Sequence, residues 1–311
     1  MTSKLIGYFK LIRPINILMI IYVQVIIKYV VFGKNEVLVA MTDFQFILLV
    51  LATVLIAAAG NVVNDIFDVN VDSINKPAKV IVWRVIPERA AYNFYIILNV
   101  LGVGVGFYLS NQLGRPGLAA IFIVISALLY IYATHIKAML LVGNILISGL
   151  VAMSLLVMVL FDIFPVIEVT ERELQLECTR IILLYAGFAF FINLIREIVK
   201  DLEDVDGDQN GGRSTVPIVF GRKRAVSIVF VLGVIALLAI LFYTYKNVYR
   251  FQTITIMYFI FLVSAPILYF CIKAWDAKTK QHYARLSVIL KVIMITGIGS
   301  LFFISETMLA S

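Results

Sequence analysis

Charged residues are scarce in this chain: they make up 14% of its 311 residues, whereas hydrophobic residues make up 62%. A soluble domain contains about 25% charged and roughly 45–50% apolar residues. The mean hydropathy of +1.01 indicates more apolar side chains than one water-facing core can bury. This deficit of charge excludes a disordered regulator, a secreted disulfide scaffold and most soluble enzymes, and it indicates a polytopic membrane protein.

Cysteine and histidine are also rare, with two residues of each. Cys178 and Cys271 have no metal-ligand spacing and form no convincing disulfide pair. His135 and His282 are far from each other and from both cysteines in the sequence, so no zinc site is expected. The net charge of +7 comes from basic residues between apolar segments, which indicates topology signals and phosphate ligands rather than a nucleic-acid partner.

Apolar runs of about 18–22 residues recur along the chain, and each is long enough to cross about 30 Å of hydrocarbon. Because the runs are continuous rather than alternating, they predict helices and exclude a β-barrel. The nine expected spans are 15–33, 44–63, 92–110, 117–135, 139–161, 180–200, 223–243, 253–273 and 285–305. The predicted fold class is therefore all-α, with one membrane domain over residues 1–311 and a short surface helix within residues 1–16.

Lysine and arginine are distributed unequally between the two predicted faces. Eighteen of them share the face of the N-terminus, seven lie on the other face, and Lys291 falls within the last span. The positive-inside rule therefore predicts a cytoplasmic N-terminus, in the cell membrane if the host is prokaryotic. Two long cytoplasmic loops are expected at 64–91 and 201–222, and the acidic outer segment 162–179 is interpreted as a solvated connector.

Two groups of aspartates share one spacing at the cytoplasmic ends of spans two and six. Their members are Asp65, Asp68 and Asp72 in the first group, and Asp201, Asp204 and Asp208 in the second. Residues spaced by three and then four positions lie on one face of a helix, where three carboxylates repel one another unless a cation neutralises them. The matched spacing predicts that the two helices face each other across a central cavity that opens to the cytoplasm.

These opposed carboxylates, with the carboxamide of Asn64, supply the hard oxygen ligands that Mg²⁺ prefers. Basic residues accompany both groups: Lys76, Lys79 and Arg84 follow the first, while Arg196 and Lys200 precede the second and Arg213 follows it. Arginine and lysine are the usual partners of a diphosphate. The combination predicts a magnesium–diphosphate site, although salt bridges within the helix are an equally good interpretation of Arg196 and Lys200.

The motifs resemble those of the UbiA superfamily of intramembrane prenyltransferases, over nearly the whole chain. The matching segments are Asn64-Asp65-x-x-Asp68-x-x-x-Asp72, Asp204-x-x-x-Asp208, Arg13-Pro14-x-Asn16, Tyr132 with Lys137, Gly143-Asn144, and 211–217 with Gly221. Within the superfamily, residues 196–208 look most like the digeranylgeranylglyceryl-phosphate synthase branch. One segment departs from the family pattern, because Lys76 and Lys79 stand where arginines are usual and Val80 replaces a proline.

The resemblance implies transfer of an isoprenyl group from a prenyl diphosphate to an amphipathic acceptor in the bilayer. The expected Mg²⁺ ligands and catalytic residues are Asp68, Asp72, Asp204 and Asp208, with Asn64 as a further ligand and Asp65 and Asp201 orienting the ligands. Diphosphate contacts are expected from Asn64, Lys76, Lys79, Lys137, Arg196 and Lys200, although a positive-inside anchor is an equally good interpretation of Lys137. Arg13 and Asn16 are expected either to place the head of the acceptor or to start the first span.

The acceptor itself stays open between a glycerol-phosphate ether lipid, which the 196–208 segment favours, and an aromatic ring of the 4-hydroxybenzoate kind. Phenylalanine and tyrosine could line a tunnel for the prenyl tail, but the sequence singles out none of them. An ion-coupled transporter is an alternative from a different class. Transporters hold intramembrane charges near the bilayer midplane, however, whereas these carboxylates cluster at helix ends.

Overall fold

A computed structural model describes residues 2–167, 172–248 and 253–308. Over these ranges nine helical segments are long and apolar enough to cross a membrane, as the sequence predicts. Their elements are α2 (Pro14–Ile26) with η1 (Ile27–Phe32), α3 (Asp43–Phe67), α5 (Glu88–Gln112), α6 (Ala119–Thr134), α7 (Val142–Met158) with η5 (Val159–Ile163), α8 (Arg172–Asn210), α10 (Arg222–Tyr243) with η7 (Thr244–Val248), α11 (Thr253–Tyr258) with η8 (Phe259–Ser264) and α12 (Ala265–Trp275), and α13 (Lys280–Gly299) leading into α14 (Leu301–Met308).

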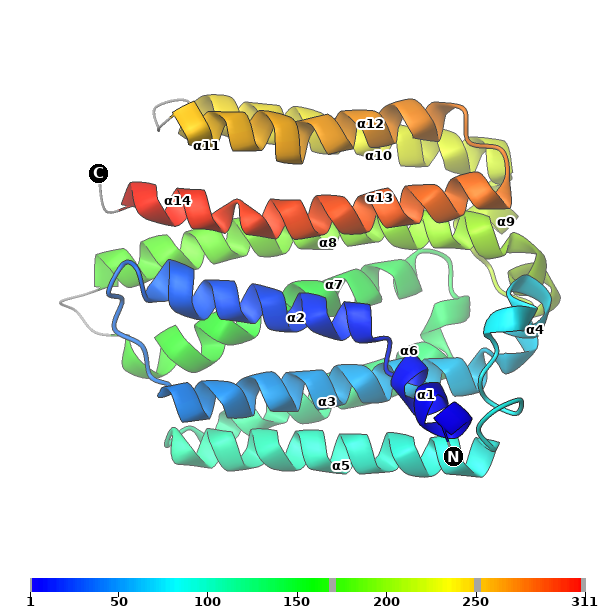
Figure 1. Ribbon diagram of the computed structural model, residues 1–311, viewed down its shortest axis with the longest axis horizontal. Coiled ribbons are helices and arrows are strands. Elements are labelled where there is room, and N and C mark those ends of the chain that lie inside the picture. Colours follow the sequence, from blue (N-terminus) through cyan, green and yellow to red (C-terminus); the bar gives the residue numbers. More distant parts are fainter. Residues whose placement is uncertain (1, 168–171, 249–252, 309–311) are drawn as a thin grey trace.

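Three short helices gather at one end of this bundle: α1 (Thr2–Leu11), α4 (Val69–Asn75) and α9 (Val216–Phe220) (Figure 1). The described part of α1 confirms the short helix expected at the N-terminus. Arg13 then turns the chain with a left-handed φ of 53°, and Pro14 begins α2 with a φ that suits the first turn of a helix. As an odd number of spans requires, α1 and α14 lie toward opposite ends of the bundle (Figure 1).

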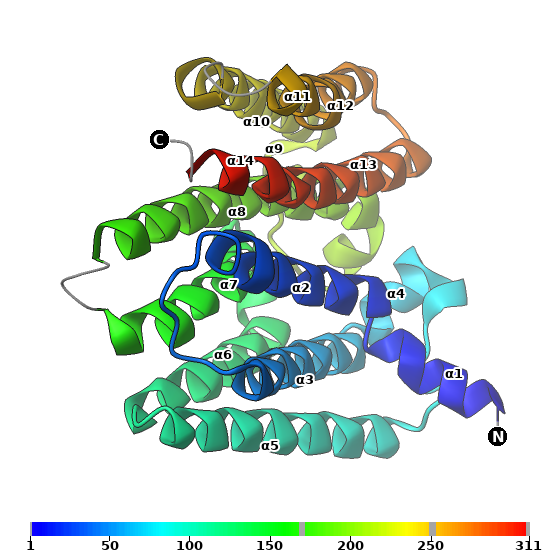
Figure 2. The same ribbon diagram turned by 60° about the vertical axis from the view of Figure 1, so that its left-hand side comes forward.

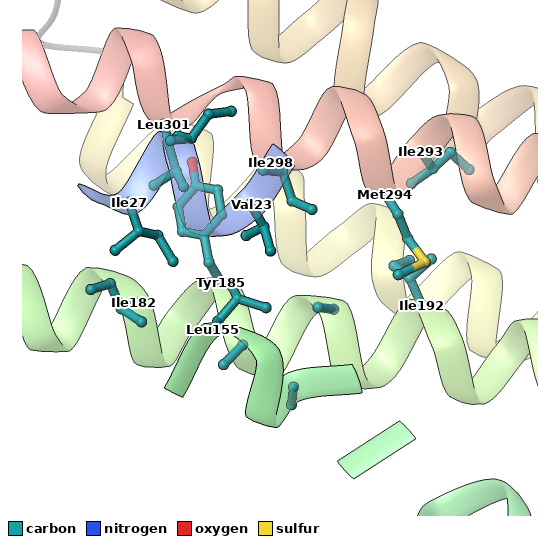
Figure 3. Packing of buried hydrophobic residues seen from close by; sticks show 14 of the residues in the cluster. Val23, Ile27, Leu155, Ile182, Tyr185, Ile192, Ile293, Met294, Ile298 and Leu301 are labelled. Atoms are coloured by element: carbon teal, nitrogen blue, oxygen red, sulfur yellow. The ribbon is translucent and has the colours of Figure 1, made fainter. Parts of the chain in front are cut away.

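The long helices form layers around α2 and α7. On one side lie α3, α5 and α6, while α8 and α13 lie on the other and carry an outer pair of α10 with α11–α12 (Figure 2). Buried side chains from α2, α7, α8 and α13 interlock around Tyr185, and Figure 3 shows Val23, Leu155 and Ile298 among them. Because lipid is as apolar as these side chains, the helices are held together mainly by this close packing.

Three expectations about the connections are wrong. Residues 64–91 are not one loop, because α3 continues to Phe67, α4 follows at Val69–Asn75 and α5 begins at Glu88. Residues 201–222 are not one loop, because α8 continues as a helix through Asn210 and carries the whole second aspartate group. The segment 162–179 is not simply a solvated connector either, because Asp162 is fully buried and lies 3.0 Å from the Lys28 ammonium group. Asp162 also accepts a hydrogen bond from the backbone of Met41, so it links its own segment to those of Lys28 and Met41. Residues 168–171 of the predicted connector lie outside the described residues.

Candidate functional site

A polar cavity of about 580 Å³ lies at the end of the bundle that carries α1 and α4, and we refer to it as the outer cavity. Twelve of the fourteen site residues expected from the sequence line it: Arg13, Asn64, Asp65, Asp68, Asp72, Lys76, Lys79, Lys137, Lys200, Asp201, Asp204 and Asp208. All six aspartates of the two matched groups are therefore at one cavity. The two groups face each other, as their shared spacing predicts.

The close approach of α4 to α8 brings the two groups together. The chain bends at Asp68, between the end of α3 and the start of α4. At Gly207 a side chain would leave no room, since an added Cβ would lie 2.4 Å from Nδ2 of Asn75 and 2.6 Å from the carbonyl oxygen of Val71. Asn75 accepts a hydrogen bond from the Gly207 backbone and donates one to the Asp204 carbonyl, both at 2.8 Å. These two bonds hold the helices at a fixed separation.

Asp68 is a buried carboxylate of the outer cavity that forms ion pairs with two cations. Its two oxygens contact Lys137 and Arg213, and Arg213 lies 2.5 Å from Asp68 and 2.9 Å from Asp208. Lys137, from the turn between α6 and α7, also donates a hydrogen bond to Asn64. Burial alone would raise the pKa of the Asp68 carboxyl, but the charges of Lys137 and Arg213 outweigh it and hold that pKa below its usual range.

Ion pairs neutralise two further carboxylates at this cavity. Lys76 lies 2.8 Å from Asp204 and 3.3 Å from Glu203, so its ammonium group forms ion pairs with two carboxylates of α8. Arg13 lies 2.5 Å from Asp65.

Two more of the expected residues at this cavity have different surroundings. Asp201 accepts a hydrogen bond of 2.8 Å from the Asn144 carboxamide, which links α8 to α7. Lys79 is exposed at the rim, so its ammonium group is accessible to a ligand that enters the cavity.

The outer cavity also contains polar groups without partners. Within the described ranges Asp72 makes no ion pair, and its burial together with the charges of Asp68, Asp65 and Asp204 raises the pKa of its carboxyl to about 6. One carboxylate oxygen of Asp204 and the hydroxyl of Thr215 are buried and have no hydrogen-bond partner. Carboxylates crowded together repel one another, and one of their oxygens has no hydrogen-bond partner. Such a set of oxygens suits a hard divalent cation.

The described side chains form no cluster of three or more acidic, histidine or cysteine residues close enough to hold a metal by themselves. The carboxylates are separated by the lysine and arginine side chains that pair with them. A magnesium ion at this site would therefore be shared with a ligand that brings its own oxygens, as Mg²⁺ commonly is with substrate phosphates.

A second, mainly apolar cavity of about 220 Å³ extends from this site into the bundle, and we refer to it as the inner cavity. Six of the nine long segments line it, those of α2, α3, α6, α7, α8 and α13, whereas α5, α10 and α12 lie outside it. Phe122 and Tyr132 are its aromatic lining residues. The two cavities share a boundary made by Arg13, Asn64, Tyr132, Glu197 and Lys200.

The last two expected site residues, Arg196 and Asn16, line the inner cavity rather than the outer one. Arg196 and Lys200 both pair with Glu197, at 3.1 and 2.8 Å, which matches the salt-bridge interpretation of these residues. Lys291 donates a 3.3 Å hydrogen bond to Asn16 across the same cavity.

The sequence indicates no specific contact for Arg213, which is only one of the basic residues beside the aspartate groups, or for Asn144, which is only part of a matching segment. It indicates no site role for Glu197 or Lys291. A signal existed for Lys291, because an ionisable residue inside an apolar span is costly and usually functional. Arg213 stands out only as one of several basic residues after the second aspartate group. Its contact with Asp68 depends on how α4 and α8 pack, which spacing along the chain does not show.

A model of the UbiA prenyltransferase family matches residues 36–293. The digeranylgeranylglyceryl phosphate synthase of Methanobrevibacter smithii is 31% identical over 281 residues, which cover 89% of this chain and 91% of the relative. The synthase of the same name from Methanosphaera stadtmanae is 26% identical, over 94% of this chain and 97% of the relative. The fold is similar to that of a UbiA homolog from Archaeoglobus fulgidus bound to GPP and Mg²⁺, with a TM-score of 0.57, 16% identity, and coverage of 95% and 99% of the two chains.

Proposed function

The chain belongs to the UbiA prenyltransferase family and is a multi-pass membrane prenyltransferase, and from this premise we propose that it transfers an isoprenyl group from a prenyl diphosphate to a glycerol-phosphate ether lipid. An ion-coupled transporter is thereby set aside. The two relatives named digeranylgeranylglyceryl phosphate synthase support the glycerol-phosphate acceptor, as does the 196–208 segment. We further propose that the whole chain acts as one domain and that the outer cavity opens to the cytoplasm.

The observation that carries this proposal is the junction of the two cavities. The outer cavity presents both anionic and cationic side chains, whereas the inner cavity is apolar along most of its length. A prenyl diphosphate has the same division, with a polyanionic head on an apolar tail. The head would bind in the outer cavity and the tail in the inner one, so that the reacting carbon lies at the shared boundary near Asn64 and Tyr132.

Asp68, Asp72, Asp204 and Asp208, with Asn64, fit the requirements of a magnesium site and would hold Mg²⁺ together with the diphosphate. When bound there, the ion supplies Lewis-acid neutralisation of the charge that develops on the leaving diphosphate. Asp65 and Asp201 would orient this set through their contacts with Arg13 and Asn144.

Cations of the outer cavity would bind the diphosphate oxygens directly, through charge-assisted hydrogen bonds. Lys79 is accessible at the rim, while Lys76, Lys137 and Arg213 would exchange part of their present carboxylate contacts for diphosphate oxygens. Lys200 reaches the same space from the boundary. Arg196 lines the inner cavity instead, which favours an interaction with the acceptor over one with the donor.

The transfer breaks the bond between the first prenyl carbon and the diphosphate oxygen, and the electron pair stays on the diphosphate. A lone pair of the acceptor hydroxyl forms the new carbon–oxygen bond, and the hydroxyl proton passes to the released diphosphate. Arg13 and Asn16, on the entry to α2, would hold the polar head of the acceptor beside the reacting carbon. The apolar wall of the inner cavity would exclude water, which would otherwise capture the prenyl cation.

The test uses purified protein in nanodiscs with radiolabelled prenyl diphosphates of different lengths, with Mg²⁺ or with EDTA. A glycerol-phosphate ether lipid and 4-hydroxybenzoate are supplied side by side with one donor, and products are identified by mass. We expect a prenylated glycerol-phosphate lipid that forms only with the divalent ion. Faster transfer to the aromatic ring, with no product from the glycerol-phosphate lipid, would assign the protein to quinone biosynthesis instead.

A further inference from the structure

Lys291 occupies an unusual position for a lysine. It lies on α13 within a segment of mean hydropathy 2.2, and its ammonium group reaches the inner cavity rather than either end of the bundle. A charge so placed is expensive to maintain and marks a functional site by default. The outer cavity, where the diphosphate is proposed to bind, does not include Lys291 among its lining residues.

The surroundings of Lys291 carry an excess of positive charge. Within the described residues it has no carboxylate partner at ion-pair distance, and its hydrogen bond goes to the neutral Asn16. The charged groups near Lys291 are those of Arg13, Arg196, Lys200 and Glu197. Asp65 belongs to the same group, because it forms an ion pair with Arg13. Both carboxylates are already paired with cations, so Lys291 and these five groups together have two positive charges in excess.

Arg196 adds an unsatisfied donor beside the same cavity. Its terminal nitrogen pairs with Glu197, but its Nε–H is buried without any hydrogen-bond partner. A buried donor that is left unpaired is destabilising because it has lost its hydrogen bonds to water, and a ligand oxygen would replace those bonds. The inner cavity therefore has excess positive charge and an unused donor at its polar end, although most of its lining is apolar.

We propose that Lys291, with Arg196 and Asn16, binds the phosphate monoester of the acceptor at an anion site separate from that of the donor diphosphate. The assignment rests on the proposed function and names the part of the acceptor that these residues recognise. A phosphate monoester carries a charge of about −1.5 to −2 at neutral pH, which matches the excess positive charge. A carboxylate with one charge would leave part of that excess uncompensated.

The location also suits the chemistry of transfer. In a glycerol phosphate, a free hydroxyl is only a few covalent bonds from the phosphorus. A phosphate held by Lys291 and Arg196 therefore confines that hydroxyl to the region near Arg13 and Lys200, where the two cavities meet. Anchoring the phosphate would convert an otherwise free collision into a positioned one.

The experiment compares Lys291→Met and Lys291→Arg with the wild type in nanodiscs, at saturating donor and Mg²⁺. Lys273→Met is the matched control, because Lys273 is exposed on α12 and lines neither cavity. Each protein is assayed with the glycerol-phosphate lipid and with the same lipid lacking its phosphate. Binding of each lipid and of the donor is measured separately, without turnover, together with the thermal unfolding midpoint.

We expect Lys291→Met to raise KM and Kd for the phosphorylated lipid by about tenfold or more, with donor binding and the unfolding midpoint unchanged. Lys291→Arg should retain much of the affinity, and Lys273→Met all of it. With the lipid that lacks phosphate, the wild type and Lys291→Met should perform alike. Equal losses on both lipids, or no loss on either, would overturn the site.

Two further outcomes distinguish a site for the lipid phosphate from a site for free phosphate, and failure of this proposal from failure of the proposed function. If inorganic phosphate binds the wild type as tightly as the phosphorylated lipid does, the site is one for free phosphate and the proposal is wrong. If the wild type binds the phosphorylated lipid through Lys291 but transfers no prenyl group to it, the anion site stands and the proposed function fails.

Discussion

Asp68 and Asp208, which come from the two opposed aspartate groups, are joined through the single guanidinium group of Arg213. The two carboxylates would otherwise repel each other across the outer cavity. Burial alone would lower the pKa of Arg213, but these two charges outweigh it and raise that pKa, so the bridge stays charged at any working pH. Arg213 thus holds the two halves of the site together before a divalent ion or a diphosphate arrives.

Arg213→Ala should destabilise the metal-free protein. Removing one partner of a buried ion pair costs about 3–5 kcal/mol, because the remaining carboxylates are left buried and unpaired. Mg²⁺ should then stabilise the variant more than it stabilises the wild type, since the ion replaces the lost positive charge. Thermal unfolding in detergent, with EDTA and with Mg²⁺, measures both effects. Identical unfolding midpoints for the two proteins in EDTA would contradict the bridging role.

Loss of a carboxylate from the proposed magnesium set should abolish turnover. The variants Asp68→Ala, Asp72→Ala, Asp204→Ala and Asp208→Ala should each lower kcat by at least about 100-fold, because charge stabilisation by a metal is worth several kcal/mol. Membrane insertion should be retained, since these residues lie at the end of the bundle.

The control for this series is Asp206→Asn. Asp206 is on α8 between Asp204 and Asp208, and its side chain is 72% exposed. It pairs with Arg222 at the surface and lines neither cavity. Its loss should leave turnover near that of the wild type. If two of the four alanine variants kept near wild-type turnover at saturating Mg²⁺, the assignment of the ligands would be wrong.

Much of this architecture was predictable from residue patterns. Continuous apolar runs are sufficient to identify nine spans, because hydrocarbon thickness fixes their length. Asp65, Asp68 and Asp72 have the same spacing as the second group, and this was sufficient to predict that all six carboxylates lie at one cavity. Helical periodicity fixes the face of the helix on which they lie.

The contacts among side chains were not predictable in the same way. That Arg213 pairs with Asp68, or that Lys291 reaches Asn16, depends on the packing of helices that are far apart in the chain. The burial of Asp162 was missed because an acidic residue next to a polar segment gives no sign of a partner such as Lys28 in the first span. Pattern indicates which residues are costly to bury, whereas packing determines which group compensates each of them.

Binding of Mg²⁺ should depend on pH through Asp72. Burial and the neighbouring carboxylates raise the pKa of this carboxyl to about 6, and only its ionised form is a ligand. As the pH falls through 6 the proton competes with the metal, so apparent affinity should drop about tenfold between pH 7.5 and pH 5. Calorimetric titration of the donor-free protein measures this, with Asp72→Asn as the control in which that pH dependence is absent. An affinity independent of pH in the wild type would exclude Asp72 as a ligand.

Gly207→Ala should impair the site without disturbing the spans. The new methyl carbon would lie 2.4 Å from Asn75 and 2.6 Å from the Val71 carbonyl, so α4 must move away from α8. Overpacking of this kind costs about 1–3 kcal/mol, and a displacement of about 1 Å at a reacting site can cost about 100-fold in rate. Both hydrogen bonds of the Asn75 carboxamide would weaken, which separates the two aspartate groups.

The matched control is Gly187→Ala on the same helix, where an added Cβ meets nothing within 4 Å and a small gain in helix stability is expected. Turnover and the unfolding midpoint are measured for both; equal activity in the two variants would show that the close approach at Gly207 does not position the carboxylates.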